Sequence, residues 1–519
     1  MSDALRAQLA LLPAYLTAHL QLTLTALVLG IAVSVPTGLW VTRRPAAERL
    51  VLGIASLLQT IPSLALLAIM VPALAALGRA TTAALGVGVP SIGFLPALIG
   101  LTLYSILPIL RNTVAGIAGV DPALVEAARA VGMTDRQRLR LVELPLALPV
   151  IVAGIRTSTV WVVGLATLST PVGAPSLGNY IFSGLQTRNL AAVLVGCGAA
   201  AALALLLDGL VHALEVGVRA GRRALVAGAA AALAALVLYA GATLAAGALG
   251  GARTVTIGSK TFTEQYVLAA ILAGRVGATS GALPRVVPSL GSTVAYDALR
   301  NGTIDCYADY SGTIWATVMH RTDVPADRGA VLAEVTRYLR EHDGVTVAAA
   351  LGFENAYALV MREDRAGAIR RISDLTARAP SLTIASDYEF FGRPEWTAVR
   401  RAYGLRFAAE RSMDPSLMYE AVAAGDVDVA SAFSTDGRIA AFALRVLEDD
   451  RSAIPPYDAI ILAGPRLVRE EPDALAALAG LAGTIDAAAM RRMNAAVDRE
   501  GRSPDAVAGA FLAGLAGAR

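Results

Sequence analysis

Aromatic and polar residues concentrate in four short stretches of the carboxyl-terminal half of the chain. The stretches are GSKTFTEQY (258–266), GTIDCYADYSGT (302–313), SDYEFFGRPEW (386–396) and SAFSTDGRI (431–439), in a chain that is only 5% aromatic. The faces of Tyr, Phe and Trp rings attract a quaternary ammonium ion, and each desolvated contact contributes about 2 kcal/mol. The stretches therefore suggest a cage for such a cation, with packing of the same rings in a core as the alternative.

Short strands and helices alternate around these stretches, which is typical of an α/β fold. Strands are expected at 254–258, 303–307, 358–361, 383–385 and 427–430, and Thr263 is expected to cap a helix that runs to 276. Further helices are expected near 293–301, 327–342, 394–403, 416–424 and 473–482. The segment 253–519 thus predicts two lobes around a cleft, with lobe 1 at 253–350 and 456–519 and lobe 2 at 351–455.

The other half, residues 1–250, is almost entirely apolar. The whole chain is 55% hydrophobic and 16% charged, whereas soluble domains are about 25% charged. Six apolar stretches approach or exceed the length that crosses a bilayer; they lie at 17–41, 50–77, 91–110, 146–171, 190–215 and 224–249. Arginines follow the first, third and fifth stretches, which predicts cytoplasmic loops there and places 253–519 outside the membrane. Arg156, within the fourth stretch, is expected either to reach the cytoplasmic edge or to line a pathway.

A polar segment, about 121–145, separates the third and fourth apolar stretches. Its landmarks are Glu126, Ala127, Ala128, Gly132, Val142, Leu144 and Pro145. We expect two short helices with a bend at Gly132 and an end at Pro145. Arg129, Arg136, Arg138 and Arg140 indicate that the segment lies on the solvent side of the membrane, because guanidinium groups are costly in hydrocarbon. An ordinary amphipathic loop is the alternative interpretation.

The same landmarks, at the same spacing, resemble the coupling loop of ABC importer permeases. In that family the loop docks into a cleft on a separate ATPase subunit. The resemblance implies that Glu126, Ala127, Ala128, Gly132 and Pro145 lie at the contact with a cytoplasmic ATPase partner. The chain itself lacks a Walker A loop, since its only lysine, Lys260, follows serine rather than glycine.

Several functions are not expected from this sequence. The four histidines show no ligand spacing, so we predict no metal and no cofactor. The arginines are scattered rather than clustered, which argues against nucleic-acid binding. The carboxyl-terminal half has no nucleophile–base pair, and a catalytic role is therefore not predicted.

Residues 253–519 resemble the substrate-binding proteins of glycine betaine, carnitine and choline importers. The resemblance is carried by IGSKTFTEQ, GSTVAYDALRNGTIDCYADYSGT, AVAAGDVDVASAFSTDGRI and VLEDD followed by PPY. It implies a two-lobed, type II periplasmic-binding-protein-like fold, and a permease with this domain fused at its carboxyl end is a known arrangement in the family. Where the family commonly has Tyr-x-Glu-Tyr-Thr-Gly-Thr, this chain has Asp309 in place of the Glu, which is one methylene shorter.

The resemblance also implies site residues. Tyr307 and Tyr310 are the best cage candidates, with Asp309 as a counter-charge. The remaining implied positions are Phe262, Thr263, Gln265, Ser292 and Thr293 from lobe 1, Tyr357, Tyr388, Phe390 and Arg393 from lobe 2, and Ser434, Thr435 and Asp436 near the hinge. Arg393 either binds a ligand carboxylate or pairs with Glu395 at the surface, and Asp436 is equally placed to cap the next helix.

Together these features predict an importer subunit: an all-α, six-span permease of the bacterial inner membrane, fused to an extracytoplasmic binding domain for a betaine-like quaternary amine. The permease is expected to form a homodimer, with ATP hydrolysed by the partner subunit. One alternative keeps the machine and changes the cargo to ergothioneine. An alternative of another class is a ligand sensor that does not transport.

Overall fold

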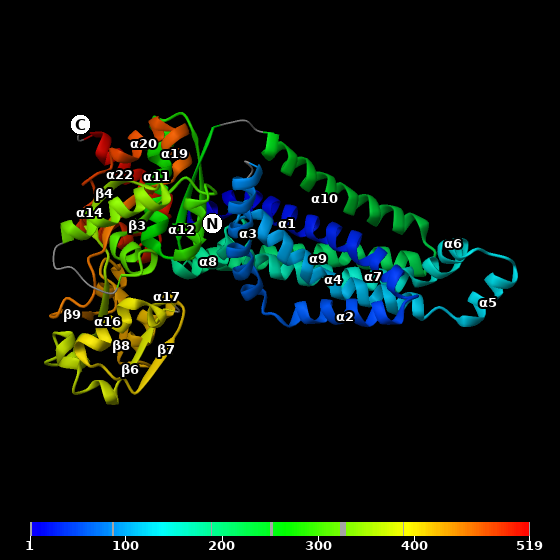
Figure 1. Cartoon of the computed structure of the whole chain (residues 1–519), viewed down its shortest axis with the longest axis horizontal. Helices are drawn as coiled ribbons and strands as arrows, with labels where there is room; N and C mark the ends of the chain where they lie inside the picture. The colour runs from blue at the N-terminus through cyan, green and yellow to red at the C-terminus, as the bar shows by residue number, and fades with distance from the viewer. Residues whose placement is uncertain are drawn as a thin grey trace. The chain divides into compact units, whose positions relative to one another are not determined.

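The computed structural model describes residues 3–85, 88–187, 189–249, 253–321, 328–387 and 389–517. The chain forms two compact units (Figure 1). The helical unit comprises Asp3–Ile181 and Ala192–Gly251, and the α/β unit comprises Phe182–Ala191 and Ala252–Arg519.

Six helical segments among the described residues are long and apolar enough to cross a membrane, which confirms the predicted six-span architecture. They are Gln8–Val41, Ser63–Thr81, Phe94–Ala118, Asp135–Val172, Leu190–Arg219 and Arg223–Ala246. The predicted second span, 50–77, is wrong in its bounds: α2 (Pro45–Thr60) ends before Pro62, and α3 (Ser63–Leu85) begins after it. Proline disfavours helical backbone at the preceding residue, and Ile61 accordingly has φ −70° and ψ 126°.

Three long helices pack along one another: α1 (Asp3–Val41), α4 (Phe94–Ala118) and α7 (Leu144–Ala166). Close approach of these helices depends on small residues, since a Cβ added at Gly154 would lie 2.5 Å from the Cβ of Asn112. α9 (Leu190–Arg219) carries Asp208, which pairs with Arg156 of α7 through two contacts of 2.6 and 2.9 Å. α10 (Arg223–Leu249) packs against α1.

The segment between α4 and α7 contains α5 (Pro122–Ala130), α6 (Asp135–Arg138) and the π-helical turn η1 (Leu139–Glu143). Asp121 caps α5 by accepting a hydrogen bond from the Ala123 amide, and Gly132 turns the chain with φ +81°. The expectation that Pro145 ends the second helix is wrong. The chain stays helical from α6 through η1 into α7, and Pro145 is the second residue of α7.

The connection between α7 and α9 contains η2 (Thr167–Val172) and α8 (Gly178–Gln186).

The first sheet of the α/β unit has the order β2-β1-β3-β10-β4. Its strands are β1 (Thr254–Lys260), β2 (Leu283–Leu290), β3 (Cys306–Tyr310), β4 (Thr346–Glu354) and β10 (Asp458–Ala463). β1 is parallel to β2 and β3, whereas β10 is antiparallel to both of its neighbours. The helical elements of this lobe are α11 (Thr263–Thr279), α12 (Ser292–Arg300), α13 (Ser311–Thr313), η3 (Ile314–Val318), α14 (Arg328–Tyr338), η4 (Leu339–Asp343), α19 (Pro465–Glu470), α20 (Pro472–Ala479), α21 (Ala487–Asp498) and α22 (Pro504–Gly517).

The second sheet has the order β7-β6-β8-β5-β9 and forms the other lobe. Its strands are β5 (Tyr357–Arg362), β6 (Thr383–Ser386), β7 (Ala409–Ser412), β8 (Val429–Phe433) and β9 (Leu444–Leu447). Its helical elements are α15 (Glu363–Ala366), η5 (Ile372–Leu375), η6 (Ala379–Ser381), η7 (Phe390–Gly392), α16 (Pro394–Tyr403), α17 (Pro415–Ala424) and α18 (Gly437–Ala441). The chain passes between the lobes twice, from β4 to β5 and from β9 to β10.

Two local expectations for the α/β unit are wrong. The strand expected at 303–307 begins three residues later, because Thr303 still donates its amide to Ala298 in the turn that ends α12. Phe262, not Thr263, is the residue that precedes the first turn of α11. The Thr263 hydroxyl is instead directed to Asp498, 2.6 Å away.

Candidate ligand site between the two lobes

Aromatic rings from both lobes meet where the chain passes between the sheets. Phe262 of the first lobe stacks on Phe433 of the second, with ring centroids 5.1 Å apart and an angle of 11° between the ring planes. Tyr310, at the end of β3, lies 6.3 Å from Phe262, and Tyr357, at the start of β5, lies 5.1 Å from Phe433. We call these four residues the interlobe cluster. They lie at or next to the ends of β1 and β3 in the first sheet and of β5 and β8 in the second.

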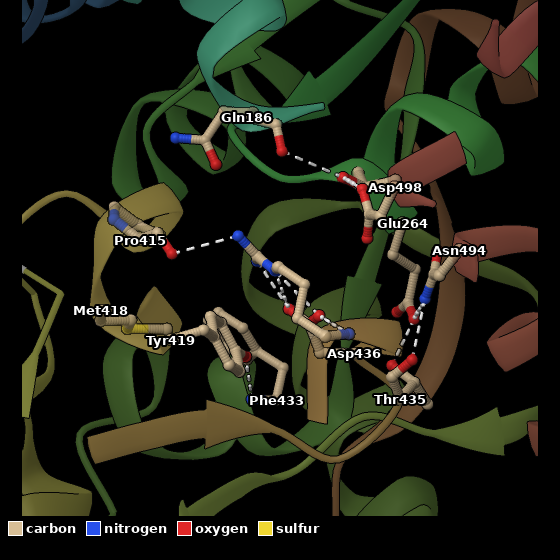
Figure 2. A network of polar contacts seen from close by, with 12 residues as sticks. Gln186, Glu264, Pro415, Met418, Tyr419, Phe433, Thr435, Asp436, Asn494 and Asp498 are labelled. Atoms are coloured by element: carbon tan, nitrogen blue, oxygen red, sulfur yellow. Dashed lines mark hydrogen bonds and ion pairs between the residues drawn. The ribbon is translucent and has the colours of Figure 1, made fainter. Parts of the chain in front are cut away.

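Glu264 is buried beside the interlobe cluster and accepts hydrogen bonds from four side chains. Tyr310 donates its hydroxyl at 2.6 Å, Asn355 its amide at 2.9 Å and Asn494 its amide at 3.2 Å. Thr435 donates its hydroxyl to the second carboxylate oxygen (Figure 2). Burial raises the pKa of Glu264 above its usual 4.5, and the four hydrogen bonds only partly oppose this. Within the described part of the chain, no arginine or lysine forms an ion pair with this carboxylate.

A small pocket opens onto Glu264. It is lined by Phe262, Thr263, Glu264, Asn355, Phe433, Thr435, Asp436, Asn494 and Asp498. Its volume of about 10 Å³ accommodates about one water molecule. A larger ligand therefore requires the lobes to separate at this point.

Tyr307 and Asp309 form a separate polar group with Lys260. Lys260 Nζ lies 2.5 Å from one oxygen of Asp309, and the Tyr307 hydroxyl donates to the other oxygen at 2.5 Å. All three side chains are buried. Burial and the neighbouring Asp309 charge raise the pKa of Tyr307 well above its usual value. The charge of Asp309 is thus compensated by lysine, and Tyr307 belongs to this group rather than to the interlobe cluster.

Arg393 is only 7% exposed and is not a surface residue. Its Nε and Nη2 donate to Glu395 at 3.1 and 3.0 Å. The guanidinium carbon lies 5.3 Å from the centre of the Tyr357 ring, which in turn contacts Phe390 at 4.7 Å. Of the two expectations for this residue, the structure shows the pairing with Glu395, but in a buried setting behind the interlobe cluster.

The remaining predicted residues are dispersed around the pocket. Gln265 donates to the Tyr310 hydroxyl at 3.0 Å, and Ser434 accepts from the amide of Ala356 at 3.1 Å. Asp436 pairs with Arg438 and also accepts the Arg438 amide, as a cap of α18 would. Ser292 and Thr293 begin α12 and do not line the pocket. Tyr388 lies outside the described residues.

The coupling segment exposes both polar and apolar side chains. Glu126, Ala127, Gly132 and Pro145 are exposed, whereas Ala128 is buried. Unlike the other three arginines of this segment, Arg138 is buried against Glu143. A guanidinium can be buried when a carboxylate neutralises it and satisfies its donors.

Comparisons with known proteins agree with this architecture. Residues 253–514 match the family described as the substrate-binding domain of the ABC-type glycine betaine transport system, and 28–220 match the binding-protein-dependent transport system inner membrane component. The chain therefore belongs to the first of these families, whose match covers half of its length. It is a permease fused to a substrate-binding domain, as predicted, and as an ABC permease it works with an ATPase subunit and a small ligand.

Individual relatives cover different parts of this ABC permease. A carnitine transport permease of Listeria monocytogenes is 43% identical over 197 residues, which cover 38% of this chain and 83% of the relative. An ergothioneine transport permease/ergothioneine binding protein of Helicobacter pylori is 26% identical over 480 residues, covering 90% of this chain and 83% of the relative. A crystal structure of a glycine betaine/carnitine/choline ABC transporter is 29% identical, with a TM-score of 0.43, covering 50% of this chain and 97% of that one.

Five pocket residues of the ABC permease were not predicted from sequence: Glu264, Asn355, Phe433, Asn494 and Asp498. Glu264 lies within the TFTEQ segment, where an acid in the first turn of a helix has an ordinary explanation as a partner of the helix dipole. Phe433 is the aromatic residue of the stretch 431–439, and that stretch was already a candidate for the site, so Phe433 could have been predicted. Asn494 is 230 residues from Glu264, and nothing local to it indicates the contact.

Proposed function

We propose that the α/β unit binds a quaternary amine of the betaine, choline or carnitine class between its lobes. The helical unit then carries the ligand inward with energy from ATP hydrolysis on the partner subunit. One observation carries this proposal: Glu264 is a buried carboxylate beside three aromatic rings, and no arginine or lysine of the described chain pairs with it.

Three other acids near the site have cationic partners. Asp309 pairs with Lys260, Glu395 with Arg393 and Asp436 with Arg438. Burying an uncompensated charge is unfavourable, and a bound cation relieves that cost. A quaternary ammonium fits this position because it cannot donate hydrogen bonds, while the acceptor oxygens of Glu264 are already hydrogen-bonded and the adjacent ring faces remain attractive to it.

Entry of the ligand requires the Phe262–Phe433 stack to separate. A cation that interacts with two ring faces lies within about 6 Å of each centroid, whereas these two rings contact each other at 5.1 Å. Since one ring belongs to each lobe, we propose that opening of the lobes exposes both faces and that closure clasps the ligand between them.

The assembly follows from the same proposal. The arginine pattern supports a binding domain on the extracytoplasmic side. We propose a permease homodimer, because a translocation pathway in this machine needs two permease subunits. Each binding domain is then tethered to its own permease, which raises its effective concentration at the membrane.

Ergothioneine is the second candidate, favoured by the relative that shares the fused arrangement over 90% of this chain. It is also a betaine, so the cation site described above serves either ligand. The two candidates differ in bulk beyond the trimethylammonium group. The lobes meet at the site in this structure, so this difference in bulk bears on the size of the opened site.

Calorimetry on the full-length chain in lipid nanodiscs tests the proposal. Glycine betaine, choline, carnitine, proline betaine and ergothioneine would be titrated separately. We expect saturable binding of at least one of them. Binding of ergothioneine alone would select the second candidate, and absence of binding for all five would refute the quaternary amine site.

A further inference from the structure

Arg138 is buried in a segment whose other arginines are exposed. Its exposed fraction is 6%, whereas Arg129, Arg136 and Arg140 all face solvent. The burial has a specific cause. Arg138 Nε lies 2.7 Å from one oxygen of Glu143, and its Nη1 lies 2.9 Å from Asp135.

Glu143 joins a third segment to this pair. Its second carboxylate oxygen accepts a hydrogen bond from Arg43 at 3.1 Å, and Arg43 lies two residues beyond the end of α1 at Val41. One carboxylate, itself 6% exposed, therefore links the cytoplasmic end of the first span, helix α6 of the coupling segment and the start of α7.

The π-helical turn η1 makes the Arg138–Glu143 contact possible. In an α-helix, residues five apart point about 140° away from each other around the axis. The wider turn over Leu139–Glu143 brings the two side chains to the same side. Single π turns within helices are frequently found at functional sites.

The sequence pattern that identifies the coupling loop does not specify which residue occupies position 143. Its landmarks include Val142, Leu144 and Pro145, but any residue is allowed between Val142 and Leu144. The role of Glu143 is therefore assigned by the contacts alone.

We propose that Glu143 is a positioning residue for ATPase coupling. The coupling segment is joined to α7 through the backbone, and the ion pairs of Glu143 with Arg138 and Arg43 join it to the end of α1. When the ATPase subunit moves the docked segment, these pairs transmit the movement to the first span as well as to α7. This inference rests on the proposed transport function.

The test uses the source bacterium, in which the native gene is replaced by variants and the native ATPase is present. Initial uptake rates would be measured for radiolabelled glycine betaine, choline and ergothioneine, supplied separately. For Glu143→Gln we expect the maximal uptake rate to fall about tenfold, as loss of a charge-assisted hydrogen bond would produce, with KM unchanged. Glu143→Asp should restore part of the rate. Arg44→Gln and Arg49→Gln remove exposed arginines close to Arg43 but outside the coupling segment, and should retain the wild-type rate.

Arg43→Gln keeps the test decisive if Glu143→Gln lowers the amount of protein in the membrane. It leaves the buried Arg138–Glu143 pair intact, yet should also lower the maximal rate, and combining it with Glu143→Gln should cause no further loss. The inference is overturned if Arg43→Gln matches the two control variants, or if Glu143→Gln changes KM alone. Absence of uptake by the wild-type chain, together with absence of binding in calorimetry, would overturn the transport function instead.

Discussion

Replacing Glu264 by Gln should weaken the binding of quaternary amines more than any other single change of similar size in the pocket. The substitution keeps the side-chain volume and removes the charge. With an effective dielectric constant of about 20, two unit charges about 5 Å apart attract each other by about 3 kcal/mol. Loss of this attraction corresponds to a rise in Kd of roughly 100-fold.

The substitution also alters four hydrogen bonds, and its effect on stability must be measured alongside. The amide nitrogen of Gln would face two donors, either Thr435 and Asn494 or Tyr310 and Asn355. Leaving such groups unsatisfied costs about 1–3 kcal/mol, while removing a buried charge offsets part of that cost. Thermal unfolding in nanodiscs would establish that the α/β unit remains folded before Kd is compared.

Calorimetry with choline and glycine betaine would give the two Kd values. Glu363→Gln is the matched control, because Glu363 pairs with Arg445 at the surface and does not line the pocket. It removes the same net charge from the domain and should leave Kd unchanged. If a folded Glu264→Gln protein bound both ligands as tightly as the wild type, Glu264 would not be the partner of the ligand cation, and the proposed site would be refuted.

Three further predictions concern the same chain. Because burial raises the pKa of Glu264 and a bound cation favours its ionised form, affinity for choline should fall as the pH is lowered through the raised pKa; Glu264→Gln should abolish this dependence in pH-resolved calorimetry. The sign for stability is opposite: because the pKa of Glu264 is raised in the folded state, the contribution of this residue to the stability of the ligand-free protein is full below its unfolded pKa and is lost as the pH rises through the folded pKa. The difference in unfolding free energy between the wild type and Glu264→Gln, measured against pH, should show this decline. Phe433→Ala should raise Kd about 30-fold by removing one cation–π contact of about 2 kcal/mol, whereas Phe433→Tyr should bind nearly normally; equal affinities for Phe433→Ala and wild type would exclude that ring from the site. Glu126→Arg should eliminate uptake in cells while leaving ligand binding by the purified chain unchanged, and normal uptake by this variant would contradict the assignment of the ATPase contact.

The six-span architecture was predictable because length and apolar composition alone determine whether a segment can cross a bilayer. Details within the spans required the structure. A run of apolar residues does not reveal that Pro62 divides 50–77 between two helices. Likewise, the sequence around the two residues did not indicate that Arg138 is buried while Arg136 is exposed. The difference is the partner carboxylate five residues away, which only the π-helical turn brings within reach.

In the α/β unit, the alternation of strands and helices was predictable, but the register of β3 was not. Thr303 and Ile304 have the composition of a strand, yet their amides complete the turn after α12. β4 and β10 were missed for another reason. β10 is buried along its whole length, and a continuous apolar run of this kind lacks the alternation that marks a half-buried strand. β4 is an edge strand that pairs with β10 across more than a hundred residues of chain.

The two acids of the site show where the limit of sequence reasoning lies. Asp309 and Glu264 are both buried carboxylates in the matched segments, and the family resemblance implied Asp309 as the counter-charge. The structure gives Asp309 a lysine and Glu264 only neutral donors. One signal for this was present: Lys260 is the only lysine of the chain, and its place in the first matched segment indicated a specific anionic partner. Since a ligand cation is attracted most strongly to the charge that the protein leaves uncompensated, assigning that lysine to Asp309 is the step that assigns the ligand to Glu264.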